Sequence, residues 1–428
     1  MNTIEVPALA RVEGEGGLYI GLKDGKAVEI RLDIYEPPRF FEGFLVGRYL
    51  QEVPDITARI CGICPVAYQM SSVAALEKAL DVEISPQAYA LRRLMYCGEY
   101  IESHALHIYL LQAPDLLGQP SALDLAAIAP QVVKDALRMK KIGNALLKGI
   151  GGRSVHPVNA CVGGFYRWPE AAPLKALLSE LEWGLAAAQA TVKWAVTLPY
   201  PELELDYEFV ALHHPQEYAV MNGEVWSSKG SQLSVSEYET RYLEEHVRHS
   251  NALHGYTKEG GHYLVGPLAR LALNHAQLLP AAQKALADNQ IKLPITNPYK
   301  SLIARAVELV QAYEEAIEVV KAYAPSGPAH LELKLKAGEG SGASEAPRGL
   351  LYHRYKIDVQ GLVQFAKIVP PTAQNLPRIE QDLLALVPQI VAMPQEQATL
   401  TAEHQVRSYD PCISCATHFL KLRIENRD

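Results

Sequence analysis

The chain has 428 residues, of which 49% are hydrophobic and 21% are charged, and its formal net charge at pH 7 is −8. This length and composition are enough to bury one large hydrophobic core or two smaller ones, so we expect a globular protein. No apolar run approaches the roughly 18 residues that a membrane span needs, and the scattered lysines and arginines form no basic stripe for nucleic acid. Membrane-spanning and nucleic-acid-binding proteins are therefore disfavoured.

The N-terminal sequence and the cysteines indicate the compartment. The first residues have neither the basic stretch nor the apolar stretch of a signal peptide. Six cysteines in a chain of this length are too few for a disulfide framework. We therefore expect a cytoplasmic protein with reduced thiols.

Hydrophobic periodicity predicts that most of the chain is helical. Residues 17–33 first alternate apolar and polar side chains around Asp24-Gly25, which predicts a β-hairpin. Apolar residues then recur at helical spacing, and Ser85-Pro86 is a suitable N-cap and first helical residue. We expect helices at 65–80, 86 to about 111, 121–149, 170–196 and 298–323.

Strand-like segments are short and lie between the helices. Runs at 205–235 and 350–369 predict small sheets, and the Gly-rich segment 337–344 is expected to be flexible. The predicted fold class is α+β, mainly helical, with a core of long helices and small peripheral β-sheets. We find no domain boundary and expect a single domain over residues 1–428.

Two Cys-x-x-Cys motifs lie near opposite ends of the chain. Cys61 and Cys64 occur in RICGICP, and Cys412 and Cys415 occur in DPCISCATH. A site with four sulfur ligands favours nickel, zinc, iron or copper(I). Because the motifs are so far apart in sequence, the domain has to fold around the site, and we expect the active site between the N- and C-terminal cysteine motifs.

Zinc is the first alternative, because it is the commoner occupant of a four-cysteine site. In zinc ribbons the two pairs are usually separated by roughly 15–20 residues, since the metal stabilises a small fold. A domain of this size does not need such support. A non-catalytic subunit stabilised by zinc nevertheless stays an alternative on the cysteines alone.

The sequences around the cysteines resemble one family. Six strings occur in the same order as in nickel-iron hydrogenase large subunits: RVEGEG at 11–16, RICGICP at 59–65, GGRSVHP at 151–157, GPLAR at 266–270, EAPRG at 345–349 and DPCISCATH at 410–418. The resemblance extends from one end of the chain to the other. It implies that the chain is the catalytic subunit of a hydrogenase.

The resemblance also implies the metal centre. Nickel would be held by Cys61, Cys64, Cys412 and Cys415, and an iron with carbon monoxide and cyanide ligands would share Cys64 and Cys415 with it. Cys61 and Cys412 would then be terminal nickel ligands. The implied reaction is the reversible heterolytic cleavage of H2 to protons and electrons.

Proton-transfer and polarising residues follow from the same strings. Cys412 would be the first base, and Glu13 in RVEG would be the first proton relay. Arg348 in EAPRG would overhang the open metal position. A guanidinium is almost never deprotonated, so we expect it to polarise rather than to accept a proton. Asp115 and Asp410 would be its carboxylate partners.

Four further residues match ligand-binding positions of the family. Glu42 and His418 would bind a third metal ion, magnesium or iron. Pro371 and Thr372 would receive the cyanides of the iron through backbone and hydroxyl hydrogen bonds.

The chain departs from the family pattern next to one cysteine motif. Relatives usually have histidine where this chain has Tyr68, which can donate a hydrogen bond but does not titrate near neutral pH. Beyond the other motif, residues 419–428 are either retained or removed as a C-terminal maturation peptide.

The cofactors and partners are predicted by counting electrons. Cys97 and Cys161 are the only cysteines left after the metal centre, too few for an iron-sulfur relay. The resemblance implies an iron-sulfur small subunit, diaphorase subunits with FAD and NAD(P), a maturation protease and nickel chaperones. We expect NAD(P) as the electron acceptor, with deazaflavin, sulfur or polysulfide as alternatives.

Overall fold

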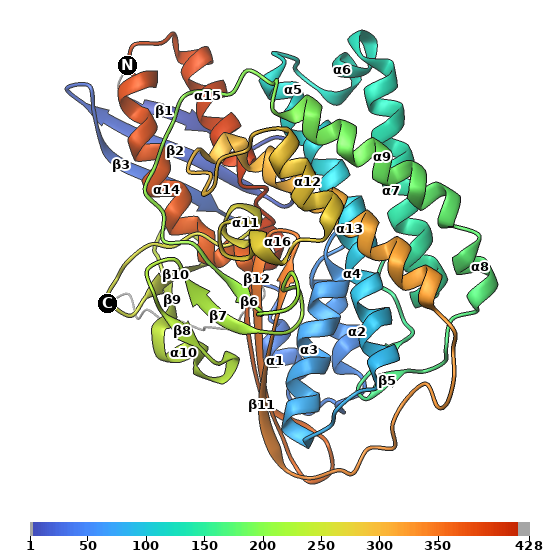
Figure 1. Ribbon diagram of the computed structural model, residues 1–428. Helices are drawn as coiled ribbons and strands as arrows, with labels where there is room; N and C mark the ends of the chain where they lie inside the picture. Colours follow the sequence, from blue (N-terminus) through green and yellow to red (C-terminus); the bar gives the residue numbers. More distant parts are fainter. Residues whose placement is uncertain (1–2, 418–428) are drawn as a thin grey trace, which may run out of the picture.

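The computed structural model describes residues 3–417 and confirms the mainly helical α+β class. Helix α4 packs against α7 and α13, and α13 packs against α9, so that these helices form the bundle on the right of Figure 1. The long helices are α3 (Pro65–Leu80), α4 (Pro86–Leu106), α7 (Pro130–Gly151), α9 (Leu178–Ala195), α13 (Ser301–Ala322), α14 (Pro371–Ile390) and α15 (Gln395–Ser408).

Local sequence signals explain where these helices begin. The predicted helix at 65–80 coincides with α3, and the Ser85 hydroxyl accepts a hydrogen bond from the Ala88 amide, 3.2 Å away, as an N-cap of α4. The predicted helix at 121–149 is instead divided into α6 (Ala122–Ile128) and α7. The break occurs because Pro130 disfavours helical geometry at the preceding Ala129, whose φ is −137°.

Small antiparallel sheets pack against the helices. The predicted hairpin is formed by β2 and β3, with Asp24 and Gly25 at positive φ in the turn. The sheets comprise β1 (Thr3–Val6), β2 (Gly16–Lys23) and β3 (Lys26–Ile34); β4 (Ala160–Cys161) and β5 (Gly164–Phe165); β6 (Val210–His213), β7 (Glu224–Ser227) and β8 (Gln232–Leu233); β9 (Tyr242–His246) and β10 (Leu253–Thr257); and β11 (Gly338–Ala346), β12 (Gly349–Ile357) and β13 (Val363–Val369).

The prediction of a flexible segment at 337–344 is wrong, because residues 338–344 belong to β11. This strand lies directly against α3, and a Cβ atom on Gly340 would come within 2.1 Å of the Ala75 carbonyl oxygen. Gly338 and Gly342 face the backbone of the same helix at similarly short range. The glycines therefore provide close backbone approach rather than flexibility.

Both cysteine motifs lie in one continuous hydrophobic cluster, to which the long helices and the sheets contribute. The remaining helices are short and include α1 (Phe41–Leu45), α2 (Val53–Thr57), α5 (Ala113–Leu116), α8 (Ala171–Lys175), α10 (Tyr238–Arg241), α11 (Pro267–Asn274), α12 (Pro280–Asp288) and α16 (Ile413–Ala416). Within residues 3–417, no helix has both the length and the apolar character needed to cross a membrane.

Candidate metal centre

The fold brings the two cysteine motifs together in a buried group of four thiols. Cys61 and Cys64 lie in the loop before α3, whereas Cys412 and Cys415 lie at the start of α16 and within it. The Sγ atoms of Cys61 and Cys412 are 3.5 Å apart, those of Cys64 and Cys415 are 3.9 Å apart, and those of Cys412 and Cys415 are 2.8 Å apart. All four sulfur atoms lie within 4.8 Å of one another, close enough to bind the same ion.

Hydrogen bonds fix the C-terminal motif relative to the rest of the site. The Cys412 amide donates to the Thr372 hydroxyl oxygen at 2.9 Å, and the Ile413 amide donates to the Glu13 carbonyl oxygen at 2.9 Å. Arg39 joins both motifs, because its guanidinium donates to the carbonyl oxygens of Ile60 and Ser414. Arg39 was not predicted as a site residue, although it lies three positions before Glu42 in the string RFFEG.

Glu13 is the carboxylate in contact with the thiols. The Cys412 Sγ donates to Glu13 Oε2 at 3.0 Å, and the same oxygen accepts the Ser414 amide at 3.1 Å. The Glu13 side chain is only partly buried, whereas Cys412 is fully buried. Burial, followed by the neighbouring thiols, raises the pKa of Cys412 well above its usual value. The pair thus joins a buried sulfur to an oxygen closer to solvent.

Arg348 provides a cation on another side of the thiols. Its Nη2 donates to Asp410 Oδ1 and its Nε donates to the Asp410 carbonyl oxygen, both at 2.8 Å. Burial opposes the charge, but Asp410 and Cys412 outweigh it and raise the pKa of Arg348 above its usual value. Burial likewise opposes the carboxylate, yet Arg348 holds the pKa of Asp410 below its usual range. Arg348 is therefore a fixed cation and not a base.

The prediction that Asp115 partners Arg348 is wrong in this structure. Asp115 Oδ2 accepts from Arg407 Nε at 2.8 Å, Asp115 Oδ1 accepts from Arg11, and His404 Nε2 lies 3.1 Å from the same Oδ1. These partners come from α15 and the N-terminal segment and use both oxygens of the carboxylate. No pattern in the sequence indicates these partners of Asp115, because all the pairs are distant along the chain.

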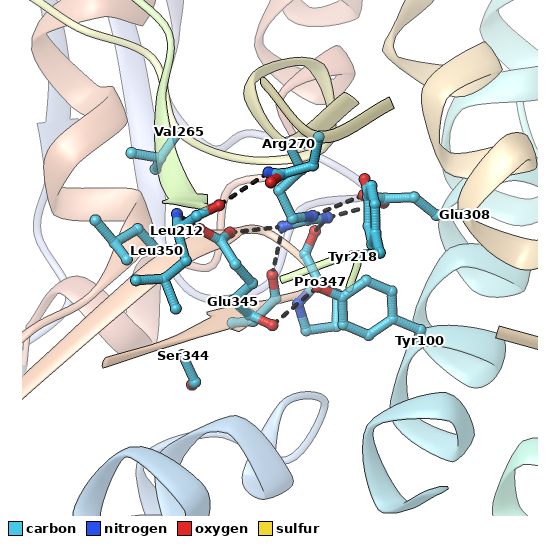
Figure 2. Close-up of polar contacts among 12 residues, drawn as sticks. Tyr100, Leu212, Tyr218, Val265, Arg270, Glu308, Ser344, Glu345, Pro347 and Leu350 are labelled. Carbon is cyan, nitrogen blue, oxygen red and sulfur yellow. Dashed lines mark hydrogen bonds and ion pairs between the residues drawn. The ribbon is translucent and has the colours of Figure 1, made fainter. Parts of the chain in front are cut away.

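A buried arginine holds the turn that carries Arg348 (Figure 2). Arg270, at the end of the GPLAR string, uses all five N–H donors of its guanidinium. Two donate to Glu308 at 2.7 and 2.8 Å, one donates to Glu345 at 3.1 Å, and two donate to the carbonyl oxygens of Ala346 and Pro347 at 2.8 and 2.9 Å. The turn between β11 and β12 is therefore fixed immediately before Arg348.

The acids around Arg270 are held from several elements. Tyr218 donates to Glu308 at 2.6 Å, the Leu212 amide donates to Glu345 at 2.8 Å, and both carboxylates are fully buried. Burial opposes ionisation of Glu308, but Arg270 outweighs it and lowers the pKa of Glu308 below its usual value. Burial raises the pKa of Glu345 to about 7. We call Arg270, Glu308 and Glu345 the arginine clamp.

Tyr68 lies inside the site, next to the cysteines. It is fully buried on α3, and its ring centroid is 5.7 Å from that of His353 on β12. Burial, followed by Cys415 and Cys64, raises the pKa of Tyr68 well above its usual value. The hydroxyl therefore stays protonated, and since it has no hydrogen-bond partner among the described residues, it can donate to a thiolate.

Of the remaining predicted ligands, Thr372 contacts the cysteine group directly. Thr372 and Pro371 form the first residues of α14, and the Thr372 oxygen accepts the Cys412 amide. Glu42 in α1 is partly buried and accepts the Ile368 amide at 2.8 Å. His418 and the segment 419–428 lie outside the described residues, so the third metal site and the maturation peptide stay predictions.

The side chains at this centre suit a cationic metal group with anionic ligands. Four buried thiols facing one another would repel as thiolates unless a cation lay between them. The buried Nη1 of Arg348 has no hydrogen-bond partner among the described residues, so it can donate to an anionic ligand of such a metal group. The donor set therefore fits nickel and iron and offers one polar contact to a ligand of the iron.

Comparison with known proteins identifies the family. Residues 39–160 and 256–418 match the family model of nickel-dependent hydrogenases. The sulfhydrogenase 1 subunit alpha of Pyrococcus furiosus is 34% identical over 424 residues, covering 98% of each chain. The subunit beta of the NAD-reducing hydrogenase HoxS of Cupriavidus necator is 27% identical and covers 97% of this chain and 94% of its own.

A solved structure agrees with these relatives. The crystal structure of an NAD+-reducing NiFe hydrogenase in the H2-reduced state superimposes with a TM-score of 0.88 at 27% identity, covering 98% of this chain and 100% of that chain. Fold and four-cysteine site together define a hydrogenase, and the chain belongs to the nickel-dependent hydrogenase family. Within the family it is the large, catalytic subunit.

Proposed function

We propose that this subunit cleaves H2 heterolytically at a nickel-iron group held by Cys61, Cys64, Cys412 and Cys415. The observation that carries the proposal is the buried group of four thiols with the carboxylate of Glu13 bonded to one of them. The bound group would supply two adjacent redox-active ions with an open coordination position at which H2 is polarised. Net cleavage of one H2 yields two protons and two electrons.

The side chains of the chain have separate roles in this proposal. Cys412 Sγ accepts the first proton and transfers it over 3.0 Å to Glu13 Oε2, which is closer to solvent. Arg348, fixed by Asp410, places a permanent positive charge beside the thiols and polarises the reacting atoms. The Thr372 hydroxyl oxygen positions Cys412 by accepting a hydrogen bond from the Cys412 amide, and the buried Tyr68 hydroxyl would donate to a thiolate of the loaded centre.

The iron's ligands and the third metal ion belong to the same proposal. Carbon monoxide and cyanide on the iron would face Arg348 and the N-terminus of α14, where Pro371 and Thr372 lie. Glu42 would hold magnesium or iron together with His418. Infrared spectroscopy tests for the ligands of the iron, since bands from both carbon monoxide and cyanide are expected in the active protein. Zinc alone in an inactive preparation would instead favour the non-catalytic subunit.

Electrons would leave through an iron-sulfur small subunit. Phe40, Phe44, Val46 and Tyr166 are exposed apolar side chains; Phe44 and Tyr166 line the same surface hollow, and Phe40 adjoins Arg39, which bonds both cysteine motifs. Clustered exposed aromatic side chains are typical of an interface. Phe44→Glu is expected to prevent co-purification of the small subunit, whereas the exposed Leu123→Glu on α6 is expected to leave it unchanged.

We propose NAD(P) as the final acceptor, reached through flavin-containing diaphorase subunits in the cytoplasm. The support is the similarity to the NAD+-reducing enzyme along the whole chain. Sulfur or polysulfide is the second candidate, because the Pyrococcus relative is named a sulfhydrogenase. Assays of H2-dependent reduction of NAD+, NADP+, polysulfide and deazaflavin by the purified complex distinguish these acceptors. If the complex reduced polysulfide but neither NAD+ nor NADP+, the proposal of NAD(P) as the acceptor would be overturned.

A further inference from the structure

A second group of metal-ligating side chains lies away from the cysteines. His249 precedes β10, His254 lies on β10, and Glu380 lies on α14. Their ligand atoms all lie within 4.8 Å of one another. Glu380 Oε1 also accepts the Leu32 amide of β3 at 2.8 Å, so three structural elements meet at this carboxylate.

His254 is the informative member of the group. Its side chain is fully buried, and neither ring nitrogen has a hydrogen-bond partner among the described residues. Buried polar atoms are nearly always paired, so an imidazole in this condition indicates a ligand. Its Nδ1 points toward Glu380, with Oε2 at 3.9 Å. Burial lowers the pKa of His254 to about 4, so the ring is neutral and has a lone pair for a metal ion.

The other two side chains complete one face of a coordination site. His249 Nε2 lies 2.8 Å from Glu380 Oε1, and the side chains of His249 and Glu380 are 23% and 17% exposed. This partial exposure gives an ion a path from solvent and leaves room for a water ligand. Metal–ligand bonds of about 2.0–2.2 Å place neighbouring ligands roughly 3–4 Å apart, so small side-chain rotations suffice.

An ordinary ion pair does not explain the group. A bond between His249 and Glu380 satisfies those two residues but leaves both nitrogens of His254 unpaired in the interior. A shared cation would bind one ring nitrogen of His254 together with His249 and Glu380. Two imidazoles and one carboxylate are typical of zinc sites with an open position and unlike the all-oxygen sites of magnesium or calcium.

We propose that His249, His254 and Glu380 form a binding site for a zinc-class divalent cation. The site is separate from the cysteine centre, because Glu380 lies eight residues beyond Thr372, about 12 Å along α14 at 1.5 Å per residue. The cation would connect β10 to α14 and, through Leu32, to β3. It would therefore stabilise the helix whose first residues contact Cys412.

The test measures Zn2+ and Co2+ binding to the assembled enzyme after dialysis against a chelator. Wild type is expected to bind one equivalent, and His254→Asn and Glu380→Gln are expected to weaken binding by at least about tenfold. Nickel and iron contents and the chelated enzyme's melting temperature should stay unchanged in Glu380→Gln, which keeps an acceptor for the Leu32 amide. His262→Asn is the matched control, because His262 neighbours His254 but lies outside the ligand group.

The Co2+ spectrum separates this site from the cysteines. Nitrogen and oxygen ligands give visible d–d bands without the near-ultraviolet charge-transfer band of thiolate ligation. No bound equivalent in wild type, equal binding by wild type and both ligand variants, or a thiolate band would each overturn the proposal.

Discussion

The Arg348 side and the Glu13 side of the metal centre are built differently. Arg348 lies in a turn that one fully buried guanidinium, in the arginine clamp, holds through Glu345 and the carbonyl oxygens of Ala346 and Pro347. Glu13 is held by two contacts to one carboxylate oxygen and is partly exposed. Both side chains nevertheless reach the same thiol group.

The difference follows from what each side chain does. A charge that polarises reacting atoms is effective only when its position is fixed beforehand, so many contacts around Arg348 are useful. A carboxylate that accepts a proton and releases it to solvent has to exchange partners, so few contacts around Glu13 are useful. Variants on the two sides should therefore separate activity from stability.

The largest effect is expected at Glu13. Glu13→Gln keeps an acceptor for the Ser414 amide but removes the proton-accepting carboxylate, so H2-dependent reduction of an artificial acceptor should fall by about 10²–10⁴-fold. The melting temperature and the nickel and iron contents should not change. Glu15→Gln, two residues away and exposed, is the control. Activity of Glu13→Gln equal to that of this control would remove Glu13 from the proton path.

The clamp should show the opposite behaviour. Arg270→Met leaves Glu308 and Glu345 buried without their cation, and we expect the free energy of unfolding to fall by roughly 3–5 kcal/mol. Activity should be lost together with thermal stability. Adding Glu308→Gln to this variant should restore part of the melting temperature, because one buried negative charge is removed. A stable Arg270→Met protein with normal turnover would show that the clamp does not position Arg348.

Substitution of Asp115 is expected to reduce stability and to leave turnover nearly unchanged. Asp115→Asn weakens the contacts to Arg407 and Arg11, and we expect a loss of roughly 1–3 kcal/mol in stability. Thermal melting and steady-state kinetics of the same preparation measure the two properties. A large fall in kcat without a change in melting temperature would show that Asp115 acts in catalysis.

The last prediction concerns the pH dependence of stability, through His107. Burial lowers the pKa of His107 to about 3 from the ordinary 6.5, and its Nε2 donates to the Arg407 carbonyl oxygen at 2.9 Å. The unfolded chain therefore takes up a proton on this residue before the folded chain does, so stability is lost as pH falls from 6.5 toward 3. The melting temperature of wild type should fall more steeply in this window than that of His107→Asn. If the melting temperatures of wild type and His107→Asn fell equally with pH, His107 would not cause the loss of stability at low pH.

Local signals in the sequence predicted much of the fold. Pro65 and Ser85 mark helix starts because proline and serine act within one turn. The sequence motifs also predicted that the cysteines, Glu13 and Thr372 would lie together, and the structure brings them together.

Contacts between distant residues were not predictable in the same way. The role of Arg270 depends on Glu308 and on two backbone carbonyls in a remote turn, and no periodicity encodes these pairings. The prediction that Asp115 pairs with Arg348 was wrong for the same reason. The composition of β11 suggested flexibility, whereas its glycines are required by a helix backbone more than 250 positions away.

The contact of β11 with α3 has a consequence for protein engineering. Cys64 directly precedes α3, and Arg348 lies in the turn after β11, so the spacing between thiol and guanidinium depends on how closely two backbones approach. Redesigning side chains in the surrounding core leaves that spacing unchanged, and adding one methyl group at Gly340 alters it. A smaller scaffold intended to carry this centre would therefore have to copy the helix and the glycine strand together, as a single graft.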